Sequence, residues 1–166
     1  KFYTSKPLWR PEMGYKKKLL IWGEQGLGDE LLFSSILKDV ENNFDKITVS
    51  VDKRLCKLLE SSFKKISFIG RDIKIDENIF DYHLPICSLG FFFRKDVNSF
   101  FNKELKFNVA EKEFPHKSKK YKCALSWKSI NKENGEERSI NLIDLIEVLK
   151  IDNVEFFDIQ YTEETE

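Results

Sequence analysis

A glycine-rich loop that carries three carboxylates is the part of the sequence best suited to chemistry. Residues 23–30, with the sequence GEQGLGDE, lie between an apolar run at 17–22 and an amphipathic segment at 30–44. Glycines let a backbone approach a ligand closely, and open α/β sheets bind ligands beyond the carboxyl ends of their strands. The alternative is a tight strand-to-helix turn with no ligand, in which Asp29 is the N-cap of the helix.

Two kinds of chemistry fit this loop. Asp52 follows the next apolar run at the spacing of a ribose-binding acid, but the glycine order is G-x-x-G-x-G rather than G-x-G-x-x-G. Glu24, Asp29 and Glu30 also crowd the helix start, where they would repel a pyrophosphate. The second kind uses the carboxylates, because an Asp at a helix N-terminus can accept a proton from a substrate hydroxyl. Asp29 is therefore the candidate general base.

The elements that would position this loop alternate between strand and helix patterns. Apolar and β-branched runs predict strands at 17–22, 47–51 and 66–69, and a fourth strand or extended loop at 80–86. Helical spacing of apolar residues, Leu32 among them, predicts a helix at 30–44, a second one capped by Asp52, and a Phe-rich one at 88–101. This alternation favours βαβ units and a parallel sheet flanked by helices.

The same pattern restarts late in the chain, with strands at 121–127 and 154–159 and a helix at 140–149. We therefore predict an α/β protein with a Rossmann-like first half and the opening of a second. Its parts are a lead-in at 1–16, a first domain at 17–107, a linker at 108–120 and a truncated second domain at 121–166. One strand–helix–strand unit cannot cover its own apolar faces, so it must lean on the first domain or lack its natural continuation.

The composition excludes several classes of protein. In 166 residues, 28 Lys and Arg balance 28 Asp and Glu, so the basic excess of a nucleic-acid or membrane-surface binder is absent. The apolar runs are too short to span a bilayer. Hydrophobic residues make up 41% of the chain, which suffices for a core, and we expect Trp22 and Trp127 inside it. Three widely spaced cysteines are typical of a reduced, cytoplasmic protein, and no metal-ligand cluster stands out.

Four polar residues outside the loop are further candidates. His83 lies near the end of the possible fourth strand and could line the same cleft, although a lone histidine is more often structural. Lys128 follows a strand of the second half and could meet a phosphate as a point charge. Arg138 could bind a phosphate bidentately at a helix start, with Ser139 as the helix cap. The alternative for both basic residues is a salt bridge with nearby glutamates.

The loop resembles the EQGLGD signature of bacterial TPR-containing glycosyltransferase-like proteins, which are similar to heptosyltransferases and to O-linked N-acetylglucosamine transferases. Further stretches are similar to motifs of that family in the same order. They are VDKRL with LL and SF at 51–63, FDYHLPI with SL at 80–89, LSWK at 125–128 followed by RSI at 138–140, and IQY at 159–161. The resemblance spans roughly residues 17–161.

The resemblance implies a GT-B fold, in which two Rossmann-like halves enclose the active site. It implies inverting transfer of a sugar from a nucleotide-sugar donor to a hydroxyl acceptor, with no metal or other cofactor. The implied catalytic base is Asp29. The implied acceptor-binding residues are Glu24, Gln25, Gly26, Gly28 and His83. The implied donor-binding residues are Lys128, Arg138 and Ser139.

The family also implies TPR helices upstream and a longer second half. We therefore expect this chain to be a fragment that is inactive alone and that self-associates through apolar surface left bare. The alternative is a non-catalytic ligand- or protein-binding module that kept the fold.

Overall fold

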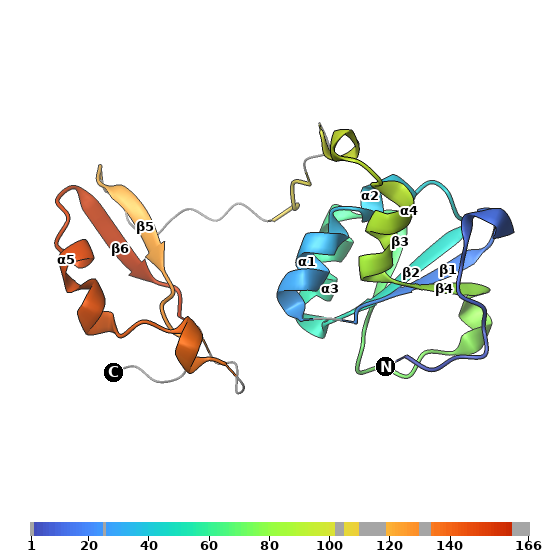
Figure 1. The fold of residues 1–166 in the computed structure, drawn as a ribbon, viewed down its shortest axis with the longest axis horizontal. Coiled ribbons are helices and arrows are strands. Elements are labelled where there is room, and N and C mark those ends of the chain that lie inside the picture. Colours follow the sequence, from blue (N-terminus) through green and yellow to red (C-terminus); the bar gives the residue numbers. More distant parts are fainter. Residues whose placement is uncertain (1, 25, 102–104, 110–118, 130–133, 161–166) are drawn as a thin grey trace. The chain divides into compact units, whose positions relative to one another are not determined.

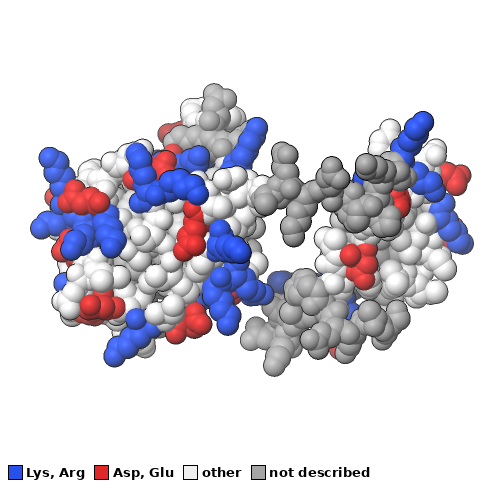
Figure 2. All heavy atoms as spheres, turned by 180° about the vertical axis from the view of Figure 1, so that it is seen from behind, with Lys and Arg blue, Asp and Glu red and all other residues white. Residues whose placement is uncertain are grey.

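The chain forms two compact units, Lys1–Glu111 and Lys112–Glu166. The computed structural model describes residues 2–24, 26–101, 105–109, 119–129 and 134–160. The division between the units falls inside the range 108–120 that the sequence predicts as a linker. No helix in the described ranges combines the length and the apolarity that crossing a membrane would need. Basic and acidic side chains are interspersed over the face of the molecule shown in Figure 2.

Unit 1 is built on a four-stranded parallel sheet with the strand order β3-β2-β1-β4 (Figure 1). The strands are β1 (Lys18–Trp22), β2 (Lys46–Val51), β3 (Ile66–Gly70) and β4 (Tyr82–Pro85). In this register Leu20 of β1 lies between Thr48 of β2 and His83 of β4. The sheet grows outward from β1 in both directions, so its carboxyl edge has a switch point between β1 and β4. This confirms the predicted α/β class with a parallel sheet, an arrangement compatible with a Rossmann-like half.

The helices that flank this sheet are shorter than predicted. They are α1 (Leu27–Ser34), α2 (Leu37–Val40), α3 (Lys53–Ser62) and α4 (Leu89–Phe93), and a 3-10 helix follows at Val97–Phe100. The single helix predicted at 30–44 is wrong, because α1 and α2 are separate. The single helix predicted at 88–101 is wrong as well. Leu32, which we expected on the buried face, is 67% exposed.

A tertiary contact from Arg94 explains the break between α1 and α2. Its Nη2 donates to the Ser35 carbonyl at 2.8 Å, and its Nε donates to Asp39 Oδ2 at 2.7 Å. In a continuous helix that Ser35 carbonyl would accept from the Asp39 amide, which instead donates to the Ile36 carbonyl at 2.9 Å. The side chain of Arg94 is 4% exposed, so this contact is part of the core.

The predicted lead-in supplies part of the core of unit 1. Trp9 is fully buried, and its ring packs against Phe44, Phe92 and Phe93 with centroids 5.3–5.8 Å apart. The Trp9 amide donates to the His83 carbonyl at 2.9 Å, and the His83 amide donates to the Pro7 carbonyl at 3.2 Å. Residues 7–9 therefore run beside β4 and hydrogen-bond to its outer edge.

Unit 2 is a single strand–helix–strand unit. Its strands β5 (Tyr121–Leu125) and β6 (Val154–Asp158) pair in parallel, and α5 (Ile146–Leu149) follows a 3-10 helix at Leu142–Leu145. We predicted that Ser139 caps this segment. This prediction is wrong, because the residue before its first turn is Asn141. Among the described residues of unit 2 only Gly135 is buried, which follows from the inability of one such unit to cover its own faces.

Candidate functional site

A pocket of about 780 Å³ opens at the carboxyl edge of the unit 1 sheet. Open α/β sheets bind ligands at this edge, and the volume lies in the range of small-molecule sites. The lining comes from the end of β1, from β2, from the loop after β3 and from the N-terminal segment. The residues are Trp22, Gly23, Glu24, Ser50, Arg71, Ile73, Lys74, Ile75, Glu77, Phe2 and Tyr3.

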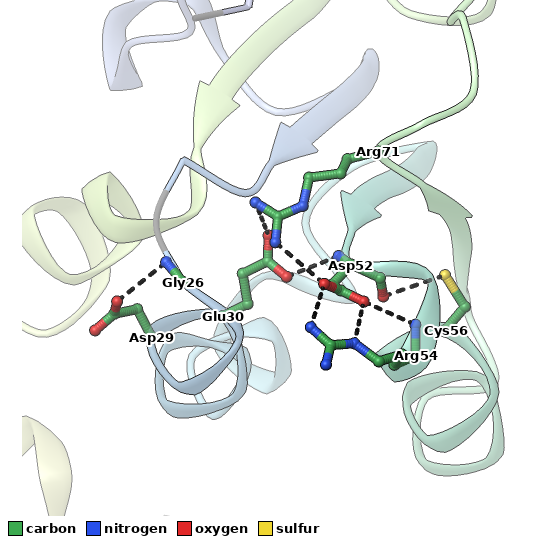
Figure 3. A network of polar contacts seen from close by, with 7 residues as sticks. All are labelled: Gly26, Asp29, Glu30, Asp52, Arg54, Cys56 and Arg71. Carbon is green, nitrogen blue, oxygen red and sulfur yellow. Dashed lines mark hydrogen bonds and ion pairs between the residues drawn. The ribbon is translucent and has the colours of Figure 1, made fainter. Parts of the chain in front are cut away.

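Glu30 is the buried centre of a network of charges behind the pocket wall (Figure 3). Its side chain is 0% exposed, and its Oε2 accepts a hydrogen bond from the Asp52 amide at 2.7 Å. Its Oε1 lies 3.4 Å from Arg71 Nη1 but makes no hydrogen bond among the described residues. Burial raises the pKa of Glu30, and the Asp52 amide and the Arg71 charge offset part of that rise.

Gly23 lines the pocket directly in front of this carboxylate. A Cβ built on Gly23 would overlap Glu30 Oε1 and lie 2.6 Å from Glu30 Cδ. A side chain at position 23 would therefore displace Glu30, and glycine is the residue that lets the two approach.

Asp52 joins this network to two arginines. Its carboxylate accepts hydrogen bonds from Arg54 Nε at 3.0 Å and Nη2 at 2.9 Å, and it lies 3.4 Å from Arg71 Nη2. The Arg54 side chain, then the Arg54 backbone N–H, hold the pKa of Asp52 well below its usual range. That N–H donates to Asp52 Oδ1 at 3.0 Å, which confirms the prediction that Asp52 caps the helix. A ribose at Asp52 would have to displace these bonds.

An aromatic cluster forms another part of the pocket wall. Trp22 Nε1 donates to His83 Nδ1 at 3.1 Å, and the Phe2 ring lies 5.5 Å from that of Trp22 and 5.8 Å from that of His83. Burial lowers the pKa of His83, which favours the neutral imidazole that accepts this bond. His83 does not line the pocket; it supports Trp22, which does. Trp22 is thus only partly buried, contrary to expectation.

Asp29 lies inside α1, at its third residue, and not at the N-cap position that we predicted. The N-cap is Gly26, whose amide donates to Asp29 Oδ2 at 3.2 Å. The helix starts earlier than predicted because the Glu30 amide already bonds back to the Gly26 carbonyl, at 3.1 Å. Gly26, Gly28 and Asp29 are exposed and do not line the pocket.

Two other loop residues were predicted on the acceptor side. Glu24 lines the pocket, as its position after β1 suggests. Gln25 lies outside the described residues. The described residues include no group of three or more His, Cys, Asp or Glu side chains placed to hold a metal ion.

The predicted donor-side residues all lie in unit 2. Lys128 is exposed, and the side-chain amide of Gln160 accepts from its backbone N–H at 3.1 Å and donates to its carbonyl at 2.8 Å. The Ser139 hydroxyl donates to the Gly135 carbonyl at 2.6 Å and accepts from the Ser129 amide at 2.9 Å. Arg138 ends an exposed 3-10 helix. The structure does not test their donor roles, which stay predictions.

Sequence reasoning missed Glu30, Ser50 and Arg71 as site residues. A signal existed for Glu30, since Glu30, Ser34 and Leu37 have helical spacing and all are buried. Arg71 directly follows the carboxyl end of β3, just as the glycine-rich loop follows the carboxyl end of β1. The same reasoning could therefore have identified Arg71. Ser50 carried no signal, because a serine in a short strand has no distinctive neighbour.

Comparisons with known proteins identify no family for this chain. No protein-family model matches it, and no solved structure does. Over 68 residues it is 34% identical to Protein FlbA of Caulobacter vibrioides, a stretch that covers 39% of this chain and 11% of that protein. The chain thus spans about a tenth of the length of this relative.

Proposed function

We propose that unit 1 is the acceptor-binding half of a GT-B-type glycosyltransferase, which transfers a sugar from a nucleotide-sugar donor to a hydroxyl acceptor. One observation carries this proposal. The pocket at the carboxyl edge combines aromatic rings with hydroxyl and charged side chains of both signs.

This combination suits a sugar or another polyol. Trp22, Phe2 and Tyr3 bring aromatic rings to the pocket lining, and the C–H face of a sugar ring can pack against such a ring. Glu24 accepts hydrogen bonds and Lys74 donates them, and every sugar hydroxyl can do both. A pyrophosphate fits less well, because the carboxylates of Glu24 and Glu77 line the same pocket and would repel it.

In this proposal Asp29 takes the proton of the acceptor hydroxyl, and Lys128, Arg138 and Ser139 bind the donor phosphates. The transfer needs no metal and no cofactor beyond the donor itself. These roles rest on the positions of the residues in the sequence pattern and on the resemblance to the family.

A second candidate function, ligand binding without transfer, is favoured by the position of Asp29. Its carboxylate accepts a hydrogen bond from the Gly26 amide at 3.2 Å and does not line the pocket. A general base must come within hydrogen-bond reach of the proton that it removes.

The test is a titration of the isotope-labelled 166-residue chain with methyl glycosides of common hexoses and with nucleotide sugars, followed by NMR. We expect the glycosides to shift the amide signals of Gly23, Glu24 and Arg71. Tyr3 and Tyr121 provide a matched pair of variants, because they are 78% and 79% exposed and only Tyr3 lines the pocket.

Tyr3→Ala should weaken glycoside binding, and Tyr121→Ala should leave it unchanged. If no saccharide shifts the signals of the carboxyl edge, the proposed function is wrong. If a longer protein containing this chain binds saccharides but never transfers a sugar to them, the second candidate, ligand binding without transfer, is favoured.

A further inference from the structure

We propose that the inner end of this pocket, at Ser50, Gly23 and Arg71, selects an uncharged, hydroxyl-bearing ring over acidic and amino sugars, and that the Ser50 hydroxyl binds it directly. This inference rests on the proposed function and names the class of acceptor.

Ser50 is the buried member of the pocket lining, with 3% of its surface exposed. Its carbonyl accepts a hydrogen bond from the Gly23 amide at 2.7 Å, which fixes it beside the end of β1. Its hydroxyl is not one of the buried side-chain atoms that lack a partner among the described residues, so it is not sealed in the core and borders the pocket. A hydroxyl that borders the pocket can donate a hydrogen bond to a ligand hydroxyl and accept one from it.

A buried atom without a hydrogen-bond partner lies behind the same wall. Glu30 Oε1 is buried and makes no hydrogen bond among the described residues, and only the absent side chain of Gly23 makes room for it. Its ion pair with Arg71 Nη1, at 3.4 Å, holds the guanidinium at the pocket wall. The inner end therefore offers a hydroxyl and an oriented arginine.

The charges beside the inner end cancel. The two acidic residues, Glu30 and Asp52, face two basic ones, Arg54 and Arg71. The N···O distances of their ion pairs are 2.9–3.4 Å. A ligand carboxylate would have to compete with Glu30 and Asp52 for Arg71 while lying close to both. A ligand ammonium at Ser50 would lie near Arg71, whereas the acids of the pocket lining, Glu24 and Glu77, are exposed or half-buried and more screened by water. An uncharged hydroxyl incurs neither penalty, so the network discriminates against both charged classes.

The test compares three related ligands by NMR titration of the 166-residue chain at neutral pH. They are a methyl hexoside that binds, the matching uronic acid glycoside and the matching amino sugar glycoside. We expect the uncharged sugar to bind about tenfold or more tightly than either charged one, which corresponds to about 1.4 kcal/mol.

Ser50→Ala should weaken binding of the uncharged sugar about two- to tenfold, the usual effect of one lost hydrogen bond, without lowering the thermal midpoint. Ser67→Ala is the matched control, because Ser67 lies on β3, is exposed and does not line the pocket. Glu30→Gln should tighten binding of the uronic acid several-fold, because it leaves the Arg71 charge less compensated.

The outcomes separate the two proposals. If no saccharide binds, the proposed function fails and this inference fails with it. If saccharides bind regardless of charge, or if Ser50→Ala binds as tightly as the unaltered chain, only the present inference is overturned.

Discussion

Replacing Gly23 with alanine tests whether the buried Glu30 carboxylate organises the carboxyl edge. The new Cβ would overlap Glu30 Oε1 and lie 2.6 Å from its Cδ and 3.0 Å from its Cγ, well inside the ~3.5–4.0 Å of ordinary carbon contacts. Backbone strain does not contribute, because Gly14 is the glycine with a positive φ among the described residues. The overlap must therefore be relieved by moving the Glu30 side chain.

The expected cost follows from what Glu30 would lose. Its Oε2 would give up the 2.7 Å hydrogen bond from the Asp52 amide, and a hydrogen bond to a charged group contributes about 1.5–3 kcal/mol. The 3.4 Å contact with Arg71 would also break, but that side chain is 39% exposed and would remain solvated. We expect the free energy of unfolding of unit 1 to fall by about 3 kcal/mol.

The assay is urea unfolding followed by tryptophan fluorescence. A Trp127→Phe background leaves Trp9 and Trp22, both in unit 1, as the reporters. In a Glu30→Ala background the new Cβ meets no carboxylate, so Gly23→Ala should then cost less than about 1 kcal/mol. Equal costs in the two backgrounds would refute the reasoning.

Gly28→Ala is the matched control for the same substitution. A Cβ on Gly28 would meet nothing within 4 Å, and Gly28 lies inside α1. We therefore expect this change to stabilise unit 1 by about 0.5–1 kcal/mol, the usual gain when alanine replaces a glycine within a helix.

Three further predictions concern charged residues of unit 1. The pKa of Glu30 is raised above 4.5 in the folded protein. The free energy of unfolding should therefore fall as the pH rises through that raised pKa and the buried carboxyl group ionises. Glu30→Gln should abolish this loss, which urea unfolding at a series of pH values will measure. Arg94→Met removes the 2.7 Å partner of Asp39 and should lower the free energy of unfolding by about 3–5 kcal/mol. Adding Asp39→Asn to this variant should restore most of the lost free energy of unfolding. An unchanged urea midpoint of Arg94→Met would contradict the prediction. Asp29→Asn preserves an oxygen that can accept the helix-capping bond and should cost less than about 1 kcal/mol. If Asp29 is the base, however, the same change should slow transfer by an active longer protein about 10²–10⁴-fold. Near-normal transfer would leave Asp29 only the role of accepting the hydrogen bond from the Gly26 amide.

The strands could be predicted because their signal is local. The runs 17–22, 47–51 and 66–69 are short, apolar and bounded by charged residues or turns, and the observed β1, β2 and β3 match each within one residue at either end. Alternation with helical segments then predicts parallel pairing without further information.

The helix breaks and the burial of the N-terminal segment could not be predicted in this way. The turn between α1 and α2 depends on Arg94, which contacts Ser35 and Asp39 from more than fifty residues away. Trp9 is buried by Phe44, Phe92 and Phe93, which lie 35, 83 and 84 residues away in the sequence. Such contacts leave no periodicity near the residues that they fix.

Glu30 is an acid on the inward face of α1, where helical patterning calls for an apolar residue. Stability alone does not account for it, because well-packed apolar residues in place of a buried ion pair are often as stable or more so. Its retention also requires a glycine at position 23 and an arginine at position 71, and both line the pocket. Violations of local rules concentrate at functional sites. The cost of burying this carboxylate is therefore better explained by its position behind the pocket wall, where it orients Arg71 and offsets its charge, than by the fold that it helps to hold.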